Sequence, residues 1–397
     1  MINVVKENGL TIISKNTKGD SVGVGVMVNV GSNQETNRLS GISHFLEHMM
    51  FETKKRDAIK LTSEIEKIGG IFNAYTSNDR TIYFGKVPKK YFNILVDVLS
   101  DMIKNPKFDL KKLAKEKNVV LAEAKMYYDN PMAYQFLLMN KTLFKKHPVK
   151  NPILGNPNAI KKMSREDLIN YHKKYYTRDN IVVCAVGNFD NINKIKECFK
   201  DVRKGKVKIN LYNEKIQNKN RILTNKRKIQ HSYIGMGFHA ANRTSKESYA
   251  FDVLGNVLGC GLSSKLGIEI REKRGLVYQI GAEYSAGKDF GSLIIYLSSD
   301  KKNIELVKKL ILDEVNKLKK ISKKDLDEAK KSIEGRFLLE YEDNLKLVDL
   351  LAKWYFLRDV KTAMDYVRNI RKVNRNDIKN IINKYMKNYS FVAIKGE

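Results

Sequence analysis

Two histidines lie four residues apart in this sequence, and a glutamate directly precedes the second. These residues are His44, Glu47 and His48. The apolar residues around them recur at helical spacing, and residues i and i+4 share one helix face. Both imidazoles can therefore bind one ion, and Glu47 is close enough to accept a proton from a water molecule bound there. The spacing predicts a catalytic zinc site.

This short pattern has an ordinary alternative, in which two partly buried histidines lie on a helix that packs into the core. The chain contains six histidines in 397 residues, and two of them fall in this motif, which favours the metal site. A catalytic zinc takes three protein ligands and keeps a fourth position for water. A further ligand must therefore come from another part of the chain.

Two glutamates in a later helical segment are candidates for this further ligand. Glu116 and Glu123 lie seven residues apart within residues 110–127, where apolar residues recur at helical spacing. They fall on or near the same stripe as Val119 and Val120, where apolar residues are expected. Glutamates beside lysines are more often solvated on a helix surface. The spacing alone leaves both possibilities open.

Seven segments of the chain stand in the order found in one family of peptidases. They are residues 31–35, 44–48, 68–77, 116–123, 153–155, 176–180 and 271–278. The H-x-x-E-H order within 44–48 is that of the inverzincins. On these motifs the chain resembles the pitrilysin/insulinase family of zinc metallopeptidases, in its half-size branch, to which mitochondrial processing peptidase and many bacterial homologues belong.

The resemblance implies a role for each residue of the motif. By this resemblance His44, His48 and Glu123 bind one zinc ion per chain, and Glu47 is the general base on a zinc-bound water. Glu116 matches the family's supporting acid, one heptad before the ligand. The implied activity is hydrolysis of internal bonds in short or unfolded peptides inside a closed chamber.

The resemblance also implies residues that bind the substrate. Arg271 and Tyr278 match a pair that relatives place opposite the zinc, where both can donate to a developing oxyanion. In four-domain relatives this pair comes from the last domain, so we expect a homodimer in which the partner subunit completes each site. Asn73 and Ala74 match an edge strand to which an extended peptide adds. Their alternatives are an exposed helix cation for Arg271, a strand core residue for Tyr278 and a sheet turn for Asn73.

An internal repeat explains the length of the chain. Residues 163–175 recur as residues 373–385, and each copy leads into a β-rich segment. This repetition predicts two homologous domains, a catalytic zinc-binding domain at 1–205 and a domain without metal at 229–397 that contributes substrate-binding residues. The polar stretch 206–228, in which Asn and Lys dominate, is the expected linker.

Strands followed by long helices indicate an α+β fold, in which each domain has a mainly antiparallel sheet flanked by helices. The expected strands include residues 21–30, 81–87, 233–238 and 291–298. The chemistry is not repeated in the second half. Phe337 aligns with Glu123, and residues 252–256 contain no histidine, so one zinc site per chain is expected.

The composition leaves two competing classes of function to weigh. A net charge of +30 and a pI near 9.7 also fit a nucleic-acid-binding protein, but the lysines are spread along the chain among acids. We therefore expect no specific nucleic-acid partner. The second alternative is a non-catalytic structural or regulatory subunit of a heterodimeric peptidase. Such subunits generally lose motif residues, whereas this chain keeps its His, Glu and His.

The remaining features concern the location of the protein. The sequence contains no apolar run of roughly 20 residues and no signal-peptide pattern at its start, so we expect no membrane contact. Its three cysteines have neither metal nor disulfide spacing. We expect a cytoplasmic protein.

Overall fold

The computed structural model describes residues 1–396, which form two compact units. Unit 1 contains residues 1–125, 152–210 and 339–363. Unit 2 contains residues 126–151, 211–338 and the chain from 364 to the end of the described residues. Each unit combines one β-sheet with helices, so the predicted α+β class is confirmed.

The sheet of unit 1 has six strands in the order β1-β2-β6-β3-β5-β4. Its strands are β1 (Ile2–Glu7), β2 (Leu10–Asn16), β3 (Ser21–Val28), β4 (Ile71–Thr76), β5 (Thr81–Pro88) and β6 (Ile181–Gly187). The β2–β6 pair is parallel and the other pairs are antiparallel. Asn8 and Gly9 form the turn between β1 and β2 with positive φ values, as an Asn-Gly hairpin turn requires.

The sheet of unit 2 has five strands in the order β7-β11-β8-β10-β9. Its strands are β7 (Arg221–Arg227), β8 (Ser232–His239), β9 (Val277–Ala286), β10 (Gly291–Ser299) and β11 (Ser390–Gly396). Only the β7–β11 pair is parallel within this sheet. The order and directions match β2-β6-β3-β5-β4 of unit 1 strand for strand, so the predicted duplication is present in the topology.

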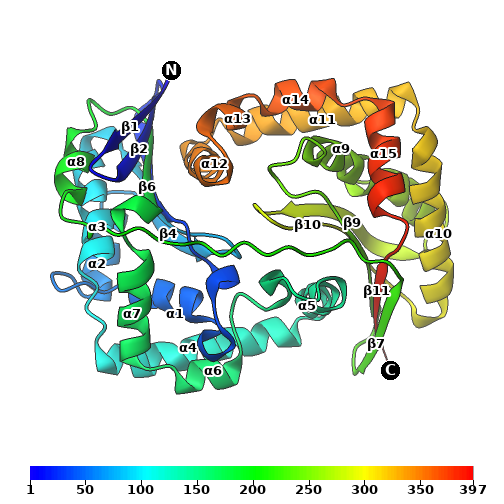
Figure 1. The fold of residues 1–397 in the computed structure, drawn as a ribbon, viewed down its shortest axis with the longest axis horizontal. Helices are drawn as coiled ribbons and strands as arrows, with labels where there is room; N and C mark the ends of the chain where they lie inside the picture. Colours follow the sequence, from blue (N-terminus) through cyan, green and yellow to red (C-terminus); the bar gives the residue numbers. More distant parts are fainter. Residues whose placement is uncertain (397) are drawn as a thin grey trace. The chain divides into compact units, whose positions relative to one another are not determined.

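Helices accompany each sheet (Figure 1). In unit 1 they include α1 (Ile42–Met49), α2 (Ala58–Glu66), α3 (Phe92–Lys104), most of α4 (Leu110–Asp129), α6 (Pro157–Lys162), α7 (Arg165–Tyr175), α8 (Asn193–Phe199) and α12 (Asn344–Leu357). In unit 2 they include α5 (Pro131–Leu143), α9 (Ser248–Gly259), α10 (Ile304–Lys317), most of α11 (Lys323–Glu340), α14 (Tyr366–Lys372) and α15 (Arg375–Tyr385). The short α13 (Val360–Met364) contains the chain position at which unit 1 ends and unit 2 resumes.

The repeated sequence forms the same local structure twice. Helix α7 begins with a capping box between Ser164 and Asp167, and α15 begins with a capping box between Asn374 and Asp377. In each box, one side chain accepts from the N3 backbone N–H and the N3 carboxylate accepts from the backbone N–H of the capping residue. Strands β6 and β11 follow these helices. The polar residues at the start of each copy therefore fix where its helix begins.

Each compact unit contains one helix that comes from the other half of the sequence. Helix α5 packs on β8 and β11 of unit 2, although it follows α4 in the first half of the chain. Helix α12 packs on β3 and β6 of unit 1, although it follows α11 in the second half. The units are therefore discontinuous in sequence. The domain limits 1–205 and 229–397 stay a prediction about homologous segments, and the linker at 206–228 stays one with them.

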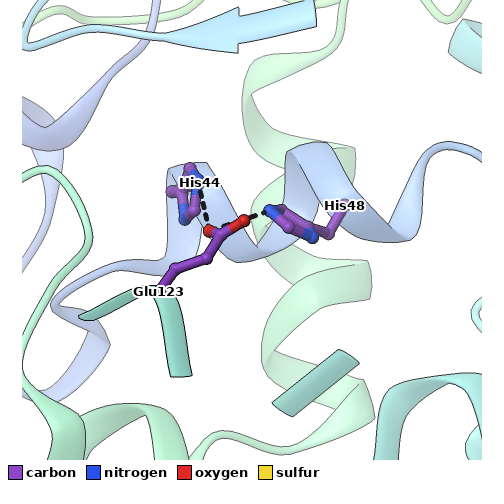
Figure 2. Close-up of side chains that lie close together, drawn as sticks. All are labelled: His44, His48 and Glu123. Atoms are coloured by element: carbon purple, nitrogen blue, oxygen red, sulfur yellow. Dashed lines mark ion pairs between the residues drawn. The ribbon is translucent and has the colours of Figure 1, made fainter. Parts of the chain in front are cut away.

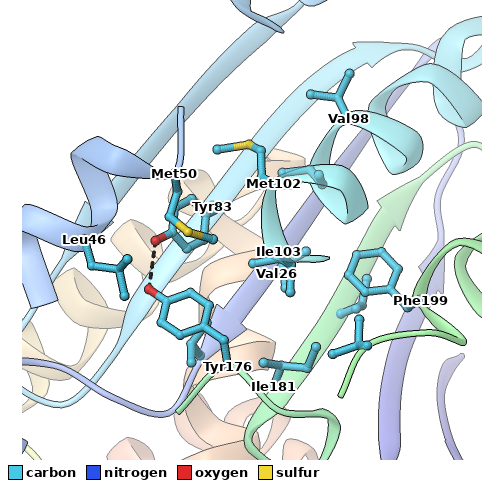
Figure 3. Packing of buried hydrophobic residues seen from close by; sticks show 14 of the residues in the cluster. Val26, Leu46, Met50, Tyr83, Val98, Met102, Ile103, Tyr176, Ile181 and Phe199 are labelled. Atoms are coloured by element: carbon cyan, nitrogen blue, oxygen red, sulfur yellow. Dashed lines mark hydrogen bonds between the residues drawn. The ribbon is translucent and has the colours of Figure 1, made fainter. Parts of the chain in front are cut away.

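The core of unit 1 supports the helix that carries the histidine motif. Leu46 and Met50 are fully buried and lie beside Tyr83 of β5 and Tyr176 (Figure 3). The Tyr83 and Tyr176 hydroxyls form a buried hydrogen bond of 2.8 Å.

Among residues 1–396, no helix combines the length and the apolar content that a membrane span requires.

Candidate metal centre

The motif helix α1 forms because its apolar residues fall on one face. Ile42, Phe45, Leu46 and Met49 recur at helical spacing, and all are fully buried. The two histidines lie between these residues in the sequence, on the side of the helix that is less buried. His44 and His48 lie one turn apart there, with side-chain exposures of 13% and 18%. The predicted helix is therefore present and brings the two imidazoles together.

The start of α1 is held by Glu35. One carboxylate oxygen of Glu35 accepts from the Gly41 N–H at 2.6 Å and the other from the Ser43 N–H at 2.9 Å. A carboxylate at this position binds the unpaired N–H groups of the first helical turn. Burial raises the pKa of Glu35 to about 7, and the backbone N–H groups of Gly41 and Ser43 oppose this rise.

The turn before α1 allows a close approach between two backbones. Gly41 has a φ of 93° and Gly155 a φ of 80°, a region that favours glycine. A Cβ on Gly155 would lie 2.3 Å from the Gly41 Cα, so a side chain has no room there. The segment 153–155, noted in the sequence, therefore fixes the position from which α1 starts.

Helix α4 brings the two candidate glutamates to α1. Its buried residues are Leu113, Val120 and Ala124, and Glu116 and Glu123 lie on the same side. Oε2 of Glu123 is 3.6 Å from Nε2 of His44 and 3.5 Å from Nε2 of His48 (Figure 2). Glu116 instead bonds the other nitrogen of His48, with 3.1 Å between its Oε2 and Nδ1. The structure therefore separates the two glutamates that the sequence left equivalent.

The geometry of these groups fits a zinc ion. His44, His48 and Glu123 form the one group of three potential metal ligands found within residues 1–396, and their ligand atoms lie within 4.8 Å of one another. Tetrahedral zinc with bonds near 2.0–2.1 Å places its ligand atoms about 3.4 Å apart, close to both histidine–carboxylate distances. The Glu116 bond keeps the proton of His48 on Nδ1 and leaves Nε2 as an acceptor. The donor set suits zinc.

Comparison with known proteins identifies the family. Residues 10–157 match the profile of the Insulinase family, Peptidase family M16, and residues 162–333 match the profile called Peptidase M16 inactive domain. A Bacillus subtilis protein named "Uncharacterized zinc protease YmxG" is 33% identical over 93% of this chain and 92% of its own length. The chain belongs to the M16 family. The predicted resemblance is therefore confirmed.

Other M16 relatives agree in sequence and fold. A protein of Rickettsia felis, named "Uncharacterized zinc protease", is 30% identical over 98% of this chain and 96% of its own length. The crystal structure of a protease from Helicobacter pylori superposes with a TM-score of 0.95 at 24% identity, covering 100% of this chain and 99% of the other. A Pseudomonas fluorescens structure of an M16 inactive domain gives a TM-score of 0.92 at 20% identity, covering 100% of this chain and 98% of the other. These two structures show the fold alone.

The two histidines of the candidate site have pKa values shifted in opposite directions. Burial and the neighbouring His48 lower the pKa of His44 to about 4, which keeps its imidazole neutral. Burial alone would lower the pKa of His48, but the Glu116 hydrogen bond and the charges of Glu123 and Glu47 together raise it. The His48 bond lowers the pKa of Glu116, so this carboxylate stays ionised. Three carboxylates around two imidazoles provide a field that attracts a cation.

Glu47, the predicted general base, is a nearly buried carboxylate beside the two histidines. It lies on α1 between the histidines, is 8% exposed, and accepts a hydrogen bond of 2.6 Å from the Thr76 hydroxyl. Burial raises the pKa of Glu47, and the Thr76 bond opposes this rise. A carboxylate with a raised pKa is better matched to accept and return a proton near neutral pH.

The predicted substrate residues lie on the edge strands or beside them. Asn73 and Ala74 are on β4, which packs against α1 and pairs only with β5 among the described strands. Tyr278 is on β9, the matching edge strand of unit 2, and is 84% exposed. Arg271 lies in the π-helical turn η6 (Gly267–Glu272), with its guanidinium carbon 5.6 Å from the centre of the Tyr278 ring. Their roles stay predictions.

Two residues that support the site are missing from the sequence predictions. Thr76 bonds Glu47, and Glu35 holds the start of α1. Both lie inside segments that carried the family resemblance. Side chains alternate between the two faces of a strand, so Thr76 lies on the same face as Phe72 and Ala74. This alternation was the sequence signal from which the position of Thr76 could have been predicted.

Proposed function

We propose that this protein is a zinc-dependent endopeptidase that cleaves short or unfolded peptides. The observation that supports it most is the convergence of His44, His48 and Glu123, with the Glu47 carboxylate on the same helix as the two histidines. Two imidazoles and one carboxylate are a ligand set of catalytic zinc, which keeps a fourth position for water or substrate. The relatives named zinc proteases support the same activity.

In this mechanism, His44, His48 and Glu123 would hold the zinc ion. When bound, zinc supplies Lewis acidity, which polarises a carbonyl and lowers the pKa of water. Glu47 accepts a proton from the attacking water and passes it to the leaving amine nitrogen as the C–N bond breaks. Glu116 holds His48 in the tautomer that directs Nε2 toward the ion.

The edge strand β4 supports binding of an extended peptide. Ser77 N–H donates to Arg80 O at the end of the β4–β5 hairpin. Bonded pairs alternate in antiparallel sheets, so Tyr75 and Asn73 face β5, whereas Ala74 directs its backbone groups outward. The Ala74 N–H is satisfied by Asn73 Oδ1 at 2.8 Å. A peptide that adds to this edge would replace the bond between the Ala74 N–H and Asn73 with a bond to its own backbone carbonyl. Binding through the backbone would depend little on the sequence of the peptide.

Arg271 and Tyr278 complete the proposal as oxyanion and substrate contacts supplied by the partner subunit of a homodimer. The exposed phenol of Tyr278 and the adjacent guanidinium offer two donors on one surface of unit 2. Mixing a Glu47→Gln chain with a Tyr278→Phe chain would place one intact site in each mixed dimer. Activity should recover toward a quarter of the wild-type value, and no recovery above the separate variants would refute completion in trans.

The test of the activity is cleavage of a mixed peptide library, read by mass spectrometry. Wild-type protein, chelator-treated protein and Glu47→Gln are compared, with Glu66→Gln on the exposed end of α2 as a matched control. We expect cleavage by the wild type and the control only, and return of activity when zinc is added after chelation. An inert wild-type protein would favour the non-catalytic subunit instead. The cytoplasmic location stays a prediction.

A further inference from the structure

Thr76 makes a contact that the mechanism above does not use. Its hydroxyl donates to Oε2 of Glu47 at 2.6 Å, and this is the one side-chain hydrogen bond that the carboxylate accepts within residues 1–396. The other oxygen, Oε1, is left for proton transfer. Because Glu47 is 8% exposed, little water is available to replace the bond. A single hydroxyl therefore fixes the rotation of the carboxylate.

The backbone of Thr76 lies where a substrate would add. The hairpin register places Thr76 two residues after Ala74, so the backbone groups of both residues point to the outer edge of β4. The side chain of Thr76 meanwhile reaches α1 and Glu47. One residue thus joins the peptide-binding edge to the base.

Other residues of β4 make contacts on both faces of the strand that do not involve Glu47. On one face, the rings of Phe72 and Phe51 pack edge to face with centroids 5.7 Å apart. On the other face, the Tyr75 hydroxyl donates to Asp349 of α12, and the Arg80 guanidinium lies 3.4 Å from that hydroxyl. Arg80 Nε also lies 4.0 Å from Asp349. The strand is therefore anchored on both faces close to Thr76.

We propose that Thr76 is a positioning residue that aligns Glu47 with the bound peptide. This inference rests on the proposed peptidase function. In the reaction, a water oxygen bonds to the peptide carbon and the C–N bond breaks. The proton from water passes through Oε1 of Glu47 to the amine. The Thr76 hydroxyl stays bonded to Oε2 during the whole reaction. Oε1 therefore faces the water before the proton is accepted, and faces the amine nitrogen when the proton is passed on.

The decisive substitution is Thr76→Val, which keeps the size and β-branching of the side chain but removes the hydroxyl. We expect kcat to fall about 10–100-fold with KM within about 2-fold, because the base loses its orientation while the strand edge remains. Thr76→Ser restores a hydroxyl and should recover most of kcat. Bound zinc should equal the wild-type value in both variants. The thermal unfolding midpoint should stay near the wild-type value in Thr76→Ser and fall by a few degrees in Thr76→Val, because the buried carboxylate loses its partner.

A double-mutant cycle separates this role from a structural one. If Thr76 acts through Glu47, adding Thr76→Val to Glu47→Gln should cost no further activity, whereas an independent role would cost the same 10–100-fold again. An unchanged kcat in Thr76→Val, or a loss explained by missing zinc, would overturn the proposal.

Failure of the proposed function gives a different result. It would appear as an inactive wild-type protein, and the inference would then be tested from a crystal structure of Thr76→Val. A Glu47 carboxylate that keeps its wild-type rotation in that structure would overturn the inference without reference to activity.

Discussion

The two units share a sheet topology but differ in α4 and α11, each the second α-helix after the edge hairpin of its sheet. In α4, Glu116 and Glu123 turn toward the imidazoles of α1. In α11, the position aligned with Glu123 holds Phe337, whose ring stacks on Tyr366 with centroids 5.3 Å apart. The scaffold depends on apolar periodicity and helix caps, which both halves keep, so the metal ligands can be absent from one half without loss of the fold.

The largest effect expected from this comparison is at Glu123. Glu123→Gln replaces a charged ligand with a neutral amide, so we expect loss of bound zinc on dialysis and a fall in kcat/KM of about 10³-fold or more. Phe337→Leu at the aligned position of α11 should keep zinc and cost about 1 kcal/mol of stability. Elemental analysis and peptide cleavage measure both. A Glu123→Gln protein with its full zinc content would contradict the ligand assignment.

A smaller effect is expected at Glu116, which touches the ligand His48 rather than the ion. Glu116→Gln removes the charge that raises the pKa of His48 and weakens the hold on Nδ1. We expect zinc affinity to fall about 10–100-fold, measured by competition with a chelator. Lys330→Gln, at the aligned position of α11, is the matched control and should leave affinity unchanged. Equal affinities for both variants would mean that Glu116 has no role at the metal.

Much of this comparison could be predicted from the sequence. The duplication and the main strands follow from repeats and alternation, and the starts of α7 and α15 follow from their capping residues. The spacing within α1 also placed His44 and His48 on one face. These features are local, so a short stretch of chain determines each of them.

What depends on contacts between distant segments could not be predicted. The residues left the choice between Glu116 and Glu123 open, because it depends on how α4 crosses α1. The packing of α5 and α12 on the sheet of the other half of the chain also depends on contacts between distant segments. The link from Thr76 to Glu47 joins residues 29 positions apart.

Each unit also contains a histidine outside the candidate metal centre whose pKa is lowered by burial, and His239 of unit 2 predicts acid sensitivity. Burial lowers the pKa of His239 to about 4 from its ordinary 6.5, and its Nδ1 accepts from the Gln217 N–H. The unfolded chain therefore binds a proton that the folded unit does not between pH 6.5 and 4. Stability is fully present above pH 6.5 and is lost as pH falls through this window, by at most about 3 kcal/mol.

His239→Gln retains an acceptor that does not titrate, so it should flatten this part of the pH dependence. Hydrogen exchange of β8 and β11 between pH 4 and 7 reports on unit 2 by itself. His172 of unit 1, whose pKa burial also lowers to about 4, remains in the variant and serves as the internal control. An unchanged pH profile for unit 2 would show that His239 does not control it.

The smallest expected effect contrasts α5 and α12. Alignment of Asn130 with Asn344 pairs Gln135 of α5 with Asp349 of α12. Asp349 accepts from the Tyr75 hydroxyl, whereas Gln135 is 1% exposed and neither its Oε1 nor its Nε2 has a partner within residues 1–396. A buried amide without partners costs free energy, so Gln135→Met should raise the free energy of unfolding by about 1 kcal/mol. Asp349→Met removes an acceptor in use and should lower that free energy instead. Denaturant unfolding measures both, and a loss of stability in Gln135→Met would mean that its amide is bonded, by water or otherwise, inside unit 2.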